Sequence, residues 1–167
     1  TTIYVTHDQE EALSLADKMA VLRDGKVVQT GGPRDLYDQP NSRFTASFLG
    51  ETNFVEGTAE SLGTDGTTVT SALGRLRSSR VLENSAIGDT ISLSLRPEAL
   101  RIIDPANDAT KAPAEWNRAA TTLNSSMFLG ETAQLELQGE GDTKLKVLEL
   151  HPRVLRSTGT ALEVAID

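Results

Sequence analysis

The alternation of apolar and polar residues changes near residue 50, and the two parts of the chain predict different structures. The first part mixes short apolar runs with apolar positions at helical spacing, which predicts helices among strands. In the second part, short stretches such as 91–95 and 133–137 alternate apolar and polar side chains. A period of two is typical of β-strands with one buried face. The pattern therefore predicts two domains, residues 1–50 and 51–167.

The first residues predict a strand that leads into a helix. The apolar run 3–5 has the composition of the end of a buried strand. Thr6 and Gln9 have the spacing of a capping box, in which a hydroxyl and an amide three residues later bind free N–H groups at a helix start. The helix is expected to continue over 12–18. His7 then lies between the carboxyl end of a strand and the positive end of a helix, where phosphates bind in many α/β proteins.

Turn residues divide the rest of the first domain. Asp24–Gly25 stands between two apolar runs and predicts a hairpin, because both residues tolerate positive φ. Pro33 suits the first turn of a short helix, since the N–H that proline lacks has no partner there. Ser42 is expected to cap another helix that ends at Gly50.

Short strands separated by turns predict a small β-barrel for the second domain. The polar stretch 104–115, with two prolines and few large apolar residues, predicts a loop. Five residues occur twice, at 48–52 and 128–132, and each copy precedes a predicted strand, so a duplicated structural unit is one explanation and chance the other. Turn sequences fall at Asp65–Gly66, Gly88–Asp89, 139–142 and Gly159.

Composition narrows the class of function. The formal net charge of −8 and the 4% aromatic content disfavour a nucleic-acid binder, which needs positive charge and stacking side chains. Without cysteine the chain cannot form disulfides or thiolate metal sites, and this suits a cytoplasmic protein. Its longest apolar run, 19–22, is far too short to cross a bilayer as a helix. We therefore expect no membrane span, no bound metal and no nucleic acid.

Residues 4–12 (YVTHDQEEA) resemble the switch-histidine loop of ABC-transporter ATPase subunits. Residue type and order agree at every position, and the resemblance continues through the hairpin and short helices as far as Gly50. It implies an α/β remnant of the ABC nucleotide-binding domain, in which His7 senses the γ-phosphate of ATP in the full-length protein. The ordinary alternative for His7 is a hydrogen-bonded histidine at a strand end.

Other parts of that ATPase machinery are missing from the chain. It holds no phosphate loop of the form GxxxxGK[ST], whose amides and lysine bind nucleotide phosphates, and no LSGGQ-like sequence. It also lacks an apolar strand that ends in Asp-Glu for Mg²⁺ and the attacking water. We therefore expect the full-length protein to bind ATP and Mg, and this piece alone neither to bind a cofactor nor to hydrolyse ATP.

The second domain resembles the TOBE regulatory domain of sugar, polyamine and iron importers. The matching residues are Asn53 and Gly57 at its start and Arg96, Pro97 and Glu98 in the middle, followed by a late Leu-Gly pair. The resemblance implies an all-β, OB-like small barrel that couples or regulates two ATPase subunits. Arg96 and Glu98 either pair across a turn fixed by Pro97 or form a small pocket or contact with the ATPase core.

We therefore expect the chain to be the C-terminal regulatory and dimerisation portion of an ABC-importer ATPase subunit. The resemblance implies permease subunits and a second copy as partners, a peripheral place on the inner, cytoplasmic face of the membrane, and polyamine, opine or iron as the solute. A free-standing OB-like module that binds a small oxyanion is the alternative from another class, and an OB-type nucleic-acid binder is the third.

Self-association is a further expectation for this chain. Unpaired apolar strand edges tend to bind other copies. In the first domain the apolar residues would lack the sheet on which such residues normally pack; they are Ile3, Val5, Leu13, Val21 and Phe44. The chain is therefore expected to form homo-oligomers, or to exchange its first residues between copies.

Overall fold

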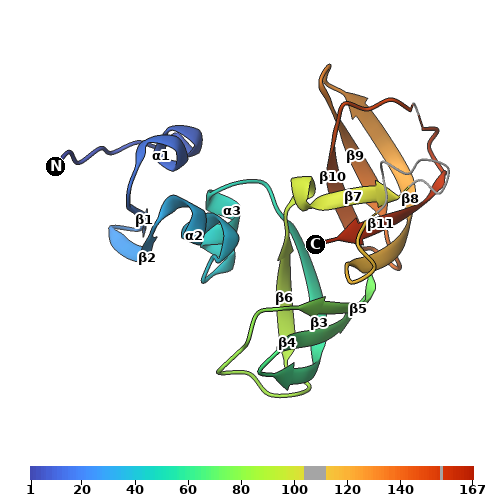
Figure 1. Cartoon of the computed structure of the whole chain (residues 1–167), viewed down its shortest axis with the longest axis horizontal. Helices are drawn as coiled ribbons and strands as arrows, with labels where there is room; N and C mark the ends of the chain where they lie inside the picture. The colour runs from blue at the N-terminus through green and yellow to red at the C-terminus, as the bar shows by residue number, and fades with distance from the viewer. Residues whose placement is uncertain (104–111, 155) are drawn as a thin grey trace. The chain divides into compact units, whose positions relative to one another are not determined.

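The computed structural model describes residues 1–103, 112–154 and 156–167. These residues form two compact units, Thr1–Thr52 and Asn53–Asp167. The units divide two residues beyond the position at which the hydropathy pattern changes. The molecule is mostly β, with a few short helices in the first unit and two sheets in the second (Figure 1).

The first unit is built from short helices around one hairpin (Figure 1). Its small core is formed by Val21, Leu36 and Leu49, which are almost completely buried, with aromatic residues packed around them. The elements are α1 (Gln9–Leu15), β1 (Met19–Arg23), β2 (Lys26–Gly31), α2 (Pro33–Asp38) and α3 (Arg43–Phe48).

Local sequence signals place most of these elements correctly. Asp24 and Gly25 form the turn between β1 and β2, with φ of 51° and 72°, as the hairpin prediction requires. Pro33 is the first residue of α2. The Ser42 hydroxyl accepts a hydrogen bond from the backbone N–H of Thr45 at 3.2 Å and thereby caps α3.

The prediction for the first eight residues is wrong in two respects. Residues 3–5 do not form a strand, and Ile3 and Val5 are 89% and 90% exposed. A strand needs a neighbour for its backbone hydrogen bonds, and no described residue pairs with this segment. The helix also begins later than Thr6 and ends earlier than expected, because α1 spans Gln9–Leu15 with Asp8 as its N-cap.

The apolar residues expected to lack partners in the first unit behave differently from one another. Val21 is 2% exposed and lies in the core, and Phe44 stacks on Phe48 with ring centroids 5.6 Å apart. Arg23 also lies over the Phe44 ring, 4.7 Å from its centroid. Short helices α2 and α3 therefore provide the packing that an absent sheet would otherwise supply.

The second unit contains two antiparallel sheets in place of one closed barrel (Figure 1). The four-stranded sheet has the order β5-β4-β3-β6, and the curled five-stranded sheet has the order β10-β9-β8-β11-β7. The elements are β3 (Asn53–Gly63), β4 (Gly66–Ser71), β5 (Gly74–Ser78), β6 (Thr90–Leu95), the 3-10 turn η1 (Pro97–Ala99), β7 (Leu100–Ile103), β8 (Asn117–Phe128), β9 (Thr132–Gln138), β10 (Lys144–Leu150) and β11 (Ala161–Ile166).

The core of the second unit follows the alternation seen in the sequence. Leu135, Leu137, Leu145 and Val147 are at most 1% exposed and face inward from β9 and β10. Val55 and Leu76 from the four-stranded sheet join the same cluster. One contiguous core therefore connects both sheets of this unit.

Two sequence expectations concern segments outside the strands. The repeated five residues are not a structural repeat, because 48–52 begin with the last residue of α3 whereas 128–132 run from the last residue of β8 to the first of β9. Of the predicted loop 104–115, residues 104–111 lie outside the described residues, and 112–115 belong to no helix or strand.

Candidate functional site

The segment around His7 is held by side chains that bind backbone amides. Asp8 Oδ1 accepts hydrogen bonds from the N–H groups of Glu10 and Glu11 at 2.9 and 3.0 Å, so the carboxylate satisfies two free donors at the start of α1. Thr6, predicted to be the N-cap, instead accepts the N–H of Asp8 at 2.9 Å. Asp8 is itself a favoured N-cap residue, which explains why it caps the helix in place of Thr6.

Glu11 fixes the residues before the helix. Its Oε2 accepts hydrogen bonds from the Tyr4 hydroxyl at 3.0 Å and from the Thr6 hydroxyl at 3.1 Å. The hydrogen bond to the Glu11 carboxylate raises the pKa of Tyr4 above its ordinary value of 10.0. The chain entering α1 is therefore ordered by charge-assisted contacts without apolar burial.

His7 is exposed directly before the N-cap of α1. Within the described part of the chain, no hydrogen bond or ion pair involves its ring. The described residues also contain no group of three or more His, Asp and Glu side chains that would hold a metal ion. His7 is thus available for an outside ligand.

Asn53 has a structural task that the sequence motif did not reveal. Its side chain donates Nδ2–H bonds to the carbonyl oxygens of Leu95 at 3.1 Å and Lys146 at 2.9 Å. Its Oδ1 accepts the N–H of Lys146 at 2.7 Å. The amide thus bonds to the Lys146 backbone as a neighbouring strand would, and it joins the four-stranded sheet to β10.

Asn117 makes the same kind of junction at another place between the sheets. Its Oδ1 accepts the N–H of Arg77 at 2.7 Å, and its Nδ2–H donates to the Arg77 carbonyl oxygen at 2.9 Å. Asn53 is the first residue of β3, and Asn117 is the first residue of β8. Nothing in the sequence distinguished Asn117, because its partner lies 40 residues away.

Gly57 lies where two backbones approach closely. A Cβ at this position would be 2.4 Å from Val69 Cγ1 and 2.7 Å from the carbonyl oxygen of Thr70. Gly57 pairs with Ser71 on one side and Ile91 on the other. Its lack of a side chain is a packing requirement of the four-stranded sheet.

Arg96, Pro97 and Glu98 form the turn between β6 and β7. Pro97 is buried and begins η1, and the Ala99 N–H donates to the Arg96 carbonyl oxygen at 3.1 Å. The predicted turn is present at this position. Asn53 approaches it through its bond to Leu95, so three of the five motif residues, Asn53, Gly57 and Pro97, have a structural explanation.

Comparison with curated proteins identifies the family. The spermidine/putrescine import ATP-binding protein PotA of Rubrobacter xylanophilus is 35% identical over 100% of this chain and 43% of the relative. The chain matches the C-terminal region of ABC-importer ATP-binding subunits. The PotA protein of Ruegeria pomeroyi is 44% identical over 87% of this chain and 40% of its own length. The PotA protein of Pseudomonas fluorescens is 34% identical over 92% of this chain and 41% of its own length. No protein-family model matches the chain.

This chain spans about two fifths of the length of these relatives.

A solved structure also resembles a large part of this chain. The cytoplasmic molybdate-binding protein ModG, solved with molybdate bound, superposes with a TM-score of 0.58 over 68% of this chain and 89% of that protein, at 14% identity. This likeness supports a shared fold. In the described residues of the importer-subunit chain, no helix is long and apolar enough to span a membrane.

Proposed function

We propose that the chain is the C-terminal regulatory and dimerisation portion of the ATPase subunit of an ABC importer for polyamines. Residues 1–50 end the nucleotide-binding domain, and residues 51–167 form a TOBE domain whose curled five-stranded sheet is an OB-like half-barrel. The sequence similarity carries the proposal, since 34–44% identity to spermidine/putrescine import proteins extends over 87–100% of the chain in three relatives. Opine and iron importers are the nearest alternatives for the solute.

The full-length protein binds ATP and Mg²⁺ and acts with permease subunits and a second copy of itself on the cytoplasmic face of the membrane. Its relatives are named as ATP-binding import proteins, which supports this assignment. Within it the second unit regulates or couples the two ATPase subunits. Its two sheets share one apolar core, which gives such a coupling domain a rigid body of its own.

His7 is the γ-phosphate sensor of that full-length protein. Its exposure before α1 and its ring without a described partner leave it free to reach a nucleotide held by other residues. In phosphoryl transfer the protein acts mainly by positioning the attacking water and stabilising charge. A histidine placed in this way contributes hydrogen bonding to the water and the γ-phosphate.

The decisive experiment compares His7→Ala with His151→Ala in the full-length protein assembled with its permease. We expect His7→Ala to lower ATP hydrolysis and spermidine or putrescine uptake by about 100-fold while ATP still binds. His151 lies exposed at the end of β10 and serves as the matched control, with activity unchanged. Full hydrolysis by His7→Ala would refute the sensor role, and uptake of iron compounds in place of polyamines would refute the solute.

A second candidate function is a free-standing module that binds a small oxyanion. The fold shared with the molybdate-binding protein ModG favours it. Two observations separate the candidates. Reading the coding sequence upstream of Thr1 should show a phosphate loop, an LSGGQ-like sequence and a strand ending in Asp-Glu if the ATPase proposal holds. A start codon near Thr1, with a saturable rise in melting temperature on adding molybdate, would favour the binding module.

A further inference from the structure

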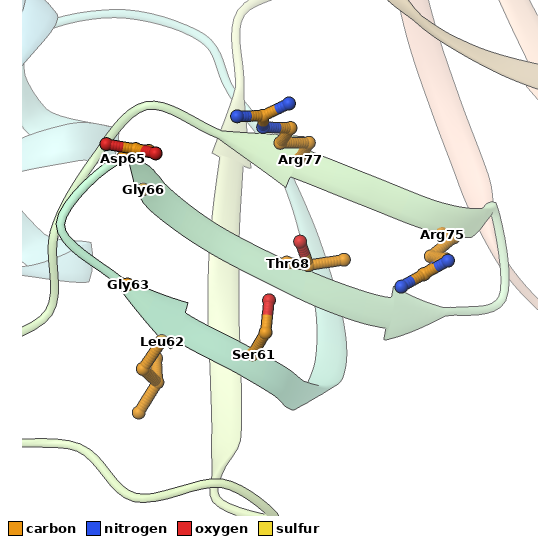
Figure 2. Close-up of a pocket in the computed structure, with 8 residues that line it drawn as sticks. All are labelled: Ser61, Leu62, Gly63, Asp65, Gly66, Thr68, Arg75 and Arg77. Atoms are coloured by element: carbon orange, nitrogen blue, oxygen red, sulfur yellow. The ribbon is translucent and has the colours of Figure 1, made fainter.

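A hollow of about 470 Å³ lies on the four-stranded sheet, across β3, β4 and β5 (Figure 2). The register aligns Ser61 with Thr68, and Thr68 with Arg77, so these three side chains form a row across the strands. Val69 and Leu76 alternate with them and are buried in the core. The hollow therefore occupies the face of the sheet opposite the core.

The hollow collects hydrogen-bond donors that have no acceptor among the described residues. In that part of the chain no hydrogen bond or ion pair involves the Arg77 guanidinium or the hydroxyls of Ser61 and Thr68. Arg75 donates its Nε–H to Glu60 Oε2 at 2.7 Å, which leaves its terminal N–H groups for another acceptor. Unused donors on three neighbouring strands favour a ligand with several acceptor oxygens.

The donors stand on a fixed backbone. Asn117 binds both the N–H and the carbonyl oxygen of Arg77, at 2.7 and 2.9 Å. Glu60 is held by the Thr70 hydroxyl at 3.1 Å as well as by Arg75. Sites on paired strands are positioned more precisely than sites on loops, so the backbone beneath the hollow is fixed before a ligand arrives.

We propose that this hollow binds a small organic anion through a phosphate or carboxylate group, with Arg77 as the principal contact. The planar guanidinium presents paired N–H groups that match either oxyanion. The volume lies within the range of small-molecule sites. Asp65 also lines the hollow, and its carboxylate repels ligands with a large negative charge. The inference is independent of the ATPase assignment.

The test titrates phenyl phosphate and benzoate into the whole chain at constant ionic strength and follows backbone amide shifts by NMR. Both probes carry the same ring, and benzyl alcohol is the uncharged control. We expect saturable shifts in residues 61–68 and 75–77 for at least one anion and none for the alcohol. Tighter phenyl phosphate binding identifies a phosphate ester as the ligand class, and tighter benzoate binding identifies a carboxylate. Linear shifts spread over other parts of the chain would overturn the proposal.

Matched charge variants distinguish binding in the hollow from a general attraction of anions to the charge of the protein. Arg77→Gln should weaken binding by about tenfold, because it removes a charge-assisted contact but keeps the backbone bonds to Asn117. Asp65→Asn should strengthen binding by about threefold, since it removes a repelling charge. Arg153→Gln, at an exposed arginine after β10, makes the same charge change elsewhere and should leave affinity unchanged. Equal weakening by Arg77→Gln and Arg153→Gln would refute the site.

Discussion

The amide side chain of Asn53 shows how much one buried polar group contributes to this fold. It is 7% exposed and exchanges hydrogen bonds with the backbone of Lys146 and Leu95. Asn53→Ala should lower the free energy of unfolding of the second unit by about 3 kcal/mol, because the Lys146 N–H loses its partner inside the protein. Urea unfolding measures the change. Asn124→Ala, at an exposed asparagine of β8, should stay within about 0.5 kcal/mol of the parent.

Asn53→Asp tests whether the hydrogen bonds that Asn53 donates are needed as well as the one it accepts. The carboxylate can still accept the Lys146 N–H, but it cannot donate to the carbonyl oxygens of Leu95 and Lys146. It should therefore destabilise the unit at neutral pH. A loss under about 1 kcal/mol for both Asn53 variants would show that the junction between the sheets does not depend on this amide.

Gly57 is predicted to tolerate no side chain. Gly57→Ala would place a Cβ 2.4 Å from Val69 Cγ1 and 2.7 Å from the Thr70 carbonyl oxygen, and the carbonyl belongs to a paired strand that cannot move away. We expect a loss of about 3 kcal/mol in unfolding free energy, measured in urea. Gly63→Ala in the same strand meets its nearest atom at 3.8 Å and should be close to neutral. Equal stability of the two variants would contradict the packing argument.

Tyr4 should titrate at a higher pH than an ordinary tyrosine. Its hydroxyl donates to Glu11, so the pKa is raised above 10.0, and the contact contributes stability below the unfolded pKa that is lost as pH rises through the folded pKa. Tyrosinate absorbance in a Tyr37→Phe background isolates this group. Glu11→Gln should move the midpoint down toward the ordinary value, while Glu10→Gln should move it much less. A midpoint that Glu11→Gln leaves unchanged would exclude the hydrogen bond.

At the scale of elements, the β1–β2 hairpin depends on its two turn residues. Gly25 has φ of 72°, and no described atom lies within 4 Å of the position that a Cβ would take, so Gly25→Ala costs only backbone strain. We expect a loss of about 1 kcal/mol in local stability, seen as faster amide hydrogen exchange in β1 and β2. Asp24→Asn should leave exchange unchanged or slower, because asparagine suits left-handed conformations. Unchanged exchange in Gly25→Ala would mean that the turn does not limit hairpin opening.

Local chemistry explains which elements the sequence predicted well. The hairpin turn, the proline at the start of α2 and the Ser42 cap depend on residues within four positions of each other. The strand prediction for residues 3–5 was wrong because a strand is stabilised by a neighbouring strand that is often distant in the sequence. The strand prediction there assumed a neighbour that the described part of this chain does not supply.

At the scale of the whole molecule, the exposed residues before α1 predict self-association. Ile3, Tyr4 and Val5 are 89%, 62% and 90% exposed and form an apolar segment outside both sheets and the hairpin. Light scattering should therefore show dimers or larger species at high protein concentration. Val5→Asp should shift the distribution toward monomer, whereas Val81→Asp, at another exposed valine, should not. A monomer at every concentration would refute this prediction.

The sequence by itself determined the two-part organisation, the hairpin, the start of α2, the cap of α3 and most of the core of the second unit, because these follow from short-range spacing and turn chemistry. The resemblance of residues 4–12 and 53–57 to an importer ATPase also needed no coordinates, and the comparisons bear it out. Only the tertiary structure decided that the β-strands form two sheets joined by Asn53 and Asn117, and that Arg77 faces a hollow with unused donors. The two junctions depend on residues 40 to 93 positions apart, and the hollow depends on the register of neighbouring strands, which hydropathy alone does not specify.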